Sequence, residues 1–186
     1  MKTVYLIHGI KTKDHERSSI SFFKYIMPRF KVVPLSYGYW PALLALIMPL
    51  INRFVVKKLI KQIHPGQILM GHSNGCTVAY GISNQFYVKG LVLINPALDE
   101  GVVFDPFLEF VHIYWSHDDS IVKLSSFMPW SLWGLMGATG YKGNDPRVRQ
   151  WEMPFRHTSI GDAEVAVRWG PIIVSNLEKE VLKNPG

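Results

Sequence analysis

The chain has 186 residues and a mass of 21.2 kDa, which suits one domain spanning residues 1–186. The hydrophobic fraction of 48% excludes an intrinsically disordered chain, and a lone cysteine, Cys76, excludes an internal disulfide. The formal net charge is +6, yet no Asp or Glu occurs between Arg17 and Leu98.

Short apolar runs alternate along the chain with longer segments of helical character. The expected strands are Val4–Ile7, Lys31–Leu35, Gln67–Met70, Leu91–Ile94 and Val111–Trp115. The expected helices are Ala42–Ile63, Thr77–Phe86 and Ile172–Leu182. Continuous apolar runs are typical of strands that are covered on both faces. The alternation therefore predicts an α/β fold with a mostly parallel central sheet flanked by helices.

The apolar and basic segments bear on membranes and nucleic acids. The first strand leaves no room before it for a signal peptide, so we expect a cytoplasmic protein. Trp40–Ile51 is shorter than the ~20 apolar residues that a membrane span needs. The basic residues are scattered, and only Lys57, Lys58 and Lys61 lie close together, which favours a solvated helix face and no nucleic-acid partner. A peripheral membrane contact through Trp40–Ile51 and these lysines is a further expectation.

The segment Gly71-His72-Ser73-Asn74-Gly75 follows an apolar strand and precedes a helix-like segment. A Gly-x-Ser-x-Gly turn in this context is typical of a nucleophile elbow. The sharp turn needs small residues two positions before and after the serine, and both glycines meet that need. The turn also places the serine at the positive end of the following helix, whose N–H groups can bind an oxyanion. The alternative is a glycine-rich turn with an incidental serine.

This elbow, together with Val4-Tyr5-Leu6-Ile7-His8-Gly9-Ile10 near the start of the chain, resembles the α/β-hydrolase fold. In size the chain is most similar to the small, cap-poor lipases and esterases of that fold. The resemblance implies that Ser73 is the nucleophile and that the backbone N–H groups of Ile10 and Asn74 form the oxyanion hole. It implies a structural role for His8.

The resemblance also implies the other two members of a catalytic triad, which in this fold follow in the order Ser, Asp, His. The segment from Val111 to Val122 is similar to the strand and loop that carry the acid, which implies Asp119. Asp118 beside it and Asp99 after the preceding strand are alternative acids. His157 is the one histidine after Asp119, although an arginine precedes it where the family usually has glycine. His157 would accept the serine proton while the acid orients the imidazole.

Two apolar stretches are candidates for the substrate pocket. Tyr39 and Trp40 follow the second strand, at the end of the sheet where this fold places its site. Trp130 and Trp133 lie in residues 125–143, which are expected to form a small lid or pocket wall. Aromatic and Met side chains can pack on variable acyl groups. Ordinary core packing is the alternative.

These residues together predict a serine hydrolase that cleaves a small-molecule carboxylic ester with an apolar acyl group, through an acyl-enzyme on Ser73. The alternatives are a thioesterase or acyltransferase with the same triad, and a non-catalytic binding protein of the same fold. No cofactor is expected. No metal site is expected either, because no His, Asp and Glu residues have zinc-ligand spacing.

Overall fold

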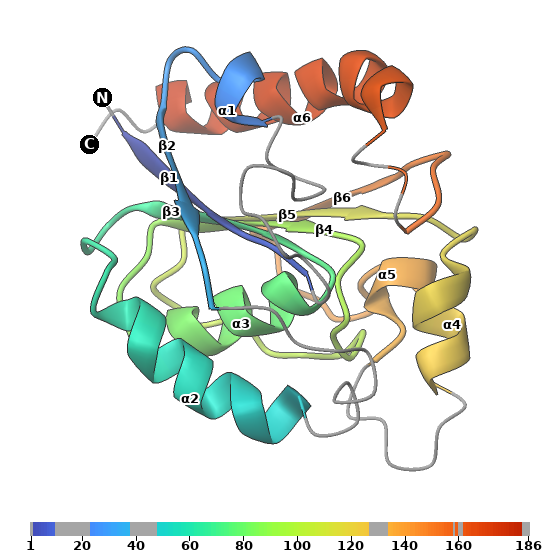
Figure 1. The fold of residues 1–186 in the computed structure, drawn as a ribbon, viewed down its shortest axis with the longest axis horizontal. Helices are drawn as coiled ribbons and strands as arrows, with labels where there is room; N and C mark the ends of the chain where they lie inside the picture. The colour runs from blue at the N-terminus through green and yellow to red at the C-terminus, as the bar shows by residue number, and fades with distance from the viewer. Residues whose placement is uncertain are drawn as a thin grey trace.

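A six-stranded sheet runs through the centre of the computed structural model (Figure 1), which describes residues 2–9, 23–37, 48–126, 134–157, 159 and 162–183. The strand order is β2-β1-β3-β4-β5-β6, and every neighbouring pair is parallel. The strands are β1 (Thr3–Ile7), β2 (Lys31–Leu35), β3 (Ile68–His72), β4 (Gly90–Ile94), β5 (Phe110–Trp115) and β6 (Val148–Glu152). The predicted α/β class is confirmed, and each of the expected strands is present.

Helices cover both faces of this sheet, as Figure 1 shows. Helices α1 (Phe23–Ile26) and α6 (Ala163–Lys183) lie on one face, and α2 (Met48–Ile60) and α3 (Asn74–Ser83) lie on the other. Helices α4 (Ser120–Ser126) and α5 (Met136–Thr139) lie beyond the end of β5. The molecule is therefore a three-layer sandwich with two apolar interfaces.

Strand β4 shows how the sequence fills both interfaces. Successive side chains of a strand point to opposite faces. Leu91 and Leu93 pack in the core on the α2 and α3 side, and Val92 and Ile94 pack in the core on the α1 and α6 side. All four side chains are fully buried. This two-sided burial explains why the strand reads as a continuous apolar run.

The structure differs from the predicted elements at the C-terminal end of the chain. Strand β6 was not predicted, because at the sheet edge its sequence VRQWE is largely exposed and carries no apolar run. Helix α6 begins at Ala163, although the prediction began only after Pro171. Proline removes one backbone hydrogen bond inside a helix. Apolar packing on the sheet offsets that loss, through the buried side chains of Ile173, Val174 and Leu177.

The direction in which the chain adds strands to the sheet reverses between β1 and β3. From β1 the chain moves outward to β2, then returns to the other side of β1 to form β3 and continues outward in the opposite direction. In open α/β sheets, ligands bind outside the carboxyl ends of the strands at such a reversal point. His8 and Gly9 follow β1 there, and Ser73 follows β3.

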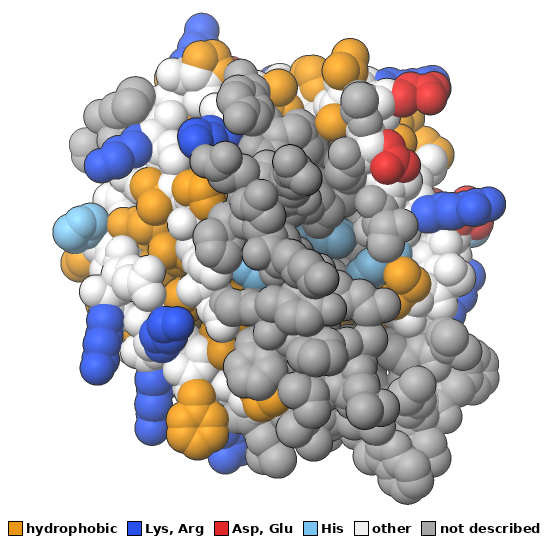
Figure 2. Space-filling view, in the orientation of Figure 1, with side chains coloured by type: hydrophobic (Ala, Val, Ile, Leu, Met, Phe, Trp, Pro, Cys, Tyr) orange, Lys and Arg blue, Asp and Glu red, His pale blue; other side chains and the backbone are white. Residues whose placement is uncertain are grey.

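The surface of α2 carries the basic character seen in the sequence. Arg53, Lys57, Lys58 and Lys61 are exposed, and the ring of Phe54 among them is 75% exposed. Figure 2 shows several Lys and Arg side chains on the α2 side of this face, and the acidic side chains visible in this view lie on the opposite side, next to further Lys and Arg side chains. Within the described residues no helix is long and apolar enough to cross a membrane. The membrane contact stays a prediction.

Candidate active site

Ser73 occupies a strained turn between β3 and α3. Its backbone has φ 55° and ψ −125°, and a positive φ is uncommon for a residue with a side chain. A Cβ on Gly71 would lie 2.7 Å from the Gly75 carbonyl oxygen, and a Cβ on Gly75 would lie 2.2 Å from the Ile7 carbonyl oxygen. Both glycines are therefore needed for the close approach of strand, turn and helix.

The structure brings the side chains of Ser73, His157 and Asp119 into one hydrogen-bonded row. His157 Nε2 lies 2.8 Å from Ser73 Oγ, and His157 Nδ1 lies 2.7 Å from Asp119 Oδ2. With a neutral imidazole, Nδ1–H donates to the carboxylate and Nε2 accepts from the serine hydroxyl. Asp119 is fully buried and His157 is 6% exposed, so little water competes for these bonds.

Asp119 is held by two further donors. The Asn95 side-chain amide donates to Oδ2 at 3.1 Å, and the backbone N–H of Val122 donates to Oδ1 at 2.9 Å. Asn95 follows β4 and has φ 46°, a conformation that asparagine tolerates better than most residues. Sequence reasoning missed Asn95, because an asparagine after a strand carries no signal for the carboxylate that it meets.

The side chains of the two alternative acids, Asp118 and Asp99, are exposed and contact groups other than His157. Asp118 Oδ1 lies 3.2 Å from His117 Nε2, and the Asp118 side chain is 61% exposed. Asp99 accepts a hydrogen bond from the backbone N–H of Gly101 at 2.8 Å. The geometry therefore favours Asp119 over both as the partner of His157.

The turn after β1 packs against the serine. A Cβ on Gly9 would lie 3.1 Å from Ser73 Cβ, so the backbone passes directly beside the nucleophile. His8 Nδ1 lies 2.7 Å from the Gly9 carbonyl oxygen, and its ring stacks on Tyr37 with centroids 4.5 Å apart. Asn74 is the first residue of α3, where a backbone N–H has no acceptor within the helix. The other predicted oxyanion-hole donor, the backbone N–H of Ile10, lies outside the described residues.

His72, the residue before the nucleophile, contacts the loop that carries His157. The His72 ring is 4% exposed, and its Nε2 lies 2.9 Å from the His157 carbonyl oxygen. Because a carbonyl can only accept, Nε2 carries the proton. Burial, together with the charge of the nearby His157, lowers the pKa of His72 to about 3. His72 is therefore a neutral donor, a role that nothing in the Gly-x-Ser-x-Gly pattern indicates.

The residues predicted to line the substrate pocket, Tyr39, Trp40, Trp130 and Trp133, lie outside the described residues. Part of the predicted lid at 125–143 is described. Within it, Met136 is fully buried and belongs to the core on the α2 and α3 side. Among the residues that the structure describes, no group of three His, Cys, Asp or Glu side chains could hold a metal ion.

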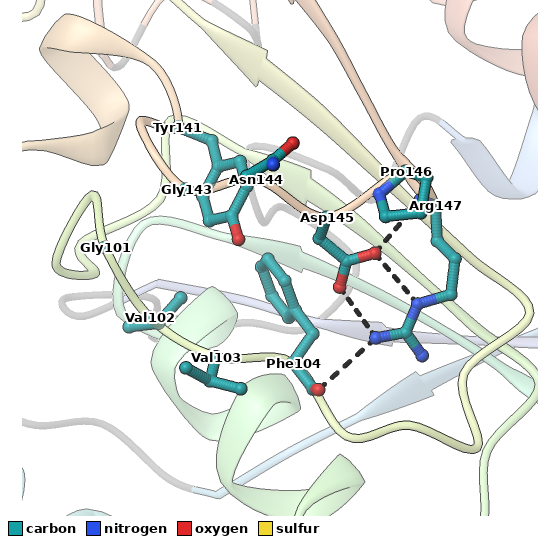
Figure 3. A pocket seen from close by; sticks show the side chains of 10 residues that line it. All are labelled: Gly101, Val102, Val103, Phe104, Tyr141, Gly143, Asn144, Asp145, Pro146 and Arg147. Atoms are coloured by element: carbon teal, nitrogen blue, oxygen red, sulfur yellow. Dashed lines mark hydrogen bonds and ion pairs between the residues drawn. The ribbon is translucent and has the colours of Figure 1, made fainter.

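A separate pocket of about 350 Å³ lies between the loops at 101–104 and 141–147 (Figure 3). Ser73, Asp119 and His157 do not line this pocket. The guanidinium of Arg147 beside it donates to the carboxylate of Asp145 and to three backbone carbonyls, those of Phe104, Asp105 and Leu108. All five N–H groups of a guanidinium are thereby used. Arg147 joins the two loops and has no donor left for a ligand.

Comparisons with known proteins find similar solved structures, although no match by sequence. No family model matches the sequence, and no curated protein matches it. One similar solved structure, a protein from Xanthomonas campestris described as a hydrolase of the α/β superfamily, has a TM-score of 0.60 at 14% identity. The match covers 95% of this chain and 99% of that one.

Two further solved structures match over nearly the whole chain. A yden-like hydrolase from Pectobacterium atrosepticum has a TM-score of 0.52 at 17% identity, with 95% of this chain and 92% of that chain covered. A serine hydrolase involved in carbazole degradation has a TM-score of 0.59 at 14% identity, with the same coverage of both chains. The chain has the α/β-hydrolase fold, as the resemblance implied.

Proposed function

We propose that this protein is a serine hydrolase that cleaves carboxylic esters through an acyl-enzyme on Ser73. The observation that carries the proposal is the row of contacts from Ser73 Oγ through His157 to Asp119, at 2.8 Å and 2.7 Å. A nucleophile within hydrogen-bond reach of a base, with that base oriented by a third group, is the signature of nucleophilic catalysis. The names of the similar structures, which include hydrolases and esterases, are consistent with this reaction class.

In the first half of the reaction, Ser73 Oγ attacks the ester carbonyl carbon while His157 Nε2 accepts the hydroxyl proton. His157 then gives this proton to the leaving alkoxide, and the alcohol departs. In the second half, His157 takes a proton from water as the water oxygen attacks the acyl carbon, and His157 then returns this proton to Ser73 Oγ as the acid is released. Asp119 holds the Nδ1–H tautomer and stabilises the imidazolium that forms in each half.

Negative charge develops on the carbonyl oxygen during both attacks. The backbone N–H of Asn74, at the N-terminal end of α3, is suited to donate to that oxygen. We assign the second donor to the turn after β1, at Ile10, because Gly9 passes directly beside Ser73. The apolar acyl group would contact Tyr39, Trp40, Trp130 and Trp133. A thioester substrate and an acyl-transfer reaction use the same steps with another leaving group or acceptor.

The decisive experiment combines active-site labelling with hydrolysis of p-nitrophenyl esters from acetate to palmitate. We expect the wild type to react with a fluorophosphonate probe and to hydrolyse at least one ester. Ser73→Ala should lose both properties, while Ser83→Ala, a control on the same helix, should keep them. The preferred chain length would report the size of the acyl pocket.

The acid can be tested with a pair of neighbouring variants. Asp119→Asn should reduce kcat by about 10⁴-fold, because an amide at this position favours the wrong imidazole tautomer. Asp118→Asn should stay within a few-fold of the wild type, since its side chain is exposed and pairs with His117. Failure of the wild type to label and to hydrolyse any ester would contradict the proposed function. Labelling without ester hydrolysis would redirect it to a thioester or acyl-transfer reaction.

A further inference from the structure

A buried polar cluster outside the Ser-His-Asp row connects four parts of the fold. It consists of Asn52 on α2, Asn74 at the start of α3, Tyr37 after β2 and the carbonyl of His8 after β1. Asn52, Asn74 and Tyr37 are 5%, 0% and 4% exposed. Around them the α2 and α3 interface is apolar, with the buried side chains of Val55, Val56 and Leu59.

The hydrogen bonds of this cluster form a continuous relay. Asn52 and Asn74 exchange two amide bonds, with Nδ2–H of each donating to Oδ1 of the other at 3.0 Å and 3.1 Å. Asn74 Nδ2 also lies 3.4 Å from Tyr37 Oη. The Tyr37 hydroxyl in turn donates to the His8 carbonyl oxygen at 2.8 Å. Burial raises the pKa of Tyr37, so the hydroxyl keeps the proton that it donates.

Stability alone does not account for such a relay. Replacing both partners of a buried hydrogen bond with apolar groups of the same shape can be neutral or stabilising, and the surrounding interface is already apolar. The two ends of the relay instead lie in the two backbone segments that flank Ser73. Asn74 directly follows Ser73, and His8 precedes Gly9, which packs on Ser73. The relay therefore fixes the distance between the elbow and the turn after β1.

We propose that Asn52 and Tyr37 are positioning residues, which hold the backbone after β1 against the elbow so that donors from both segments converge on the developing oxyanion. This inference rests on the proposed hydrolase function. Neither side chain contacts the reacting atoms. Their role is to keep the His8 carbonyl and the backbone N–H of Asn74 in fixed places, because donors must be preorganised to stabilise a transition state. A displacement of about 1 Å in a catalytic site can cost 10²-fold in rate.

The first test removes the Tyr37 hydroxyl alone. Tyr37→Phe should lower kcat and the rate of fluorophosphonate labelling by about tenfold, with KM within twofold and an unshifted pH profile, because the Ser-His-Asp row is intact. The matched control is Tyr80→Phe, which removes another tyrosine hydroxyl bound to a backbone carbonyl, that of Val103, away from the site. This control should keep the wild-type kcat and labelling rate even where its melting temperature falls.

The second test acts on the other end of the relay. Asn52→Leu should reduce kcat and labelling as Tyr37→Phe does, while Val56→Ala, an apolar truncation on the same helix, should lower only the melting temperature. Because the two residues act through Asn74, the double variant Asn52→Leu/Tyr37→Phe should be no more than about twofold slower than the slower single variant. If the two residues acted independently, the losses in kcat of the two single variants would multiply in the double variant.

The outcomes separate the relay from the function on which it rests. A wild type that neither labels nor hydrolyses contradicts the proposed function, and the relay with it. A wild type that labels, beside Tyr37→Phe and Asn52→Leu variants with unchanged kcat and labelling, overturns the relay alone. Losses that follow the melting temperature in all four single variants, the two controls included, would likewise show that the cluster only stabilises the fold.

Discussion

At the scale of single residues, His72 joins the strand that carries the nucleophile to the loop that carries the base. Its Nε2–H donates to the His157 carbonyl at 2.9 Å, and the two rings lie 5.1 Å apart. A charged His72 would repel the imidazolium that forms on His157 during catalysis. Burial, which lowers the pKa of His72 to about 3, keeps this neighbour neutral over the working pH range.

We therefore expect His72 to position the base through its neutral donor. His72→Leu removes the donor and should reduce kcat by about tenfold, because the imidazole can then shift relative to Ser73. His72→Gln keeps an N–H near the position of Nε2 and should recover most of the loss. Steady-state kinetics of both variants provide the measurement. Equal losses in the two variants would show that ring packing, rather than the hydrogen bond, is what His72 contributes.

Sequence and structure agree at residue scale where chemistry leaves a local pattern. The Gly-x-Ser-x-Gly turn singles out Ser73, and chain order leaves His157 as the one late histidine. Asn52, Asn95 and His72 carry no such pattern. Each acts through a partner far away in the sequence, for example the His157 carbonyl 85 residues beyond His72. Only the folded chain brings these partners together.

At the scale of elements, strands β3 and β4, which were predicted, contrast with strand β6, which was missed. Strands buried on both faces need apolar side chains at every position, which is why β3 and β4 are visible in the sequence. Edge strand β6 needs apolar side chains at few positions and reads as a polar loop. Helix α6 was shortened in the prediction because Pro171 is a local breaker, whereas its packing on the sheet is a tertiary effect.

The contact between α3 and β1 gives an element-scale prediction. Gly75→Ala places a Cβ 2.2 Å from the Ile7 carbonyl oxygen, a backbone atom at the carboxyl end of β1 that is held in place by the neighbouring strands. We expect a loss in unfolding free energy of about 3 kcal/mol or more. Gly81→Ala on the same helix meets only the Val56 Cγ2 methyl, at 2.9 Å, which a small side-chain shift can relieve. It should be close to neutral, because alanine also favours the helix by about 1 kcal/mol.

Urea unfolding of these two glycine variants measures the difference directly. A midpoint for Gly75→Ala close to that of Gly81→Ala would mean that α3 can move away from β1. The tight contact between helix and strand would then not be required for the elbow.

At the scale of the whole molecule, His112 links stability to pH. It lies on β5, fully surrounded, between the rings of Phe110 and Trp151 at 5.1 Å and 5.0 Å. Neither ring nitrogen has a hydrogen-bond partner among the described residues. The pKa of His112 is lowered to about 4, chiefly by burial; Glu180 opposes this shift, and Arg149 and Lys183 contribute to it. The folded protein therefore holds this imidazole neutral in an apolar layer.

The sign of the effect follows from proton linkage. A histidine in an unfolded chain has a pKa of about 6.5, so it binds a proton below that pH. In the folded protein His112 binds this proton only near pH 4. His112 should thus destabilise the fold progressively between these two pH values, by up to about 3 kcal/mol. His112→Phe removes the titrating group while keeping an aromatic ring, whereas His64→Gln removes an exposed histidine as a control.

Urea unfolding from pH 7 to pH 4 should show the His112→Phe variant losing less stability than the wild type, with a difference that grows as the pH falls. The absolute stability at pH 7 is not the test, because phenylalanine also changes packing. The slope with pH is specific, since only a group with different proton affinities in the two states produces it. Curves that run parallel would show that His112 is solvated or protonated in the fold, contrary to its buried position between two aromatic rings.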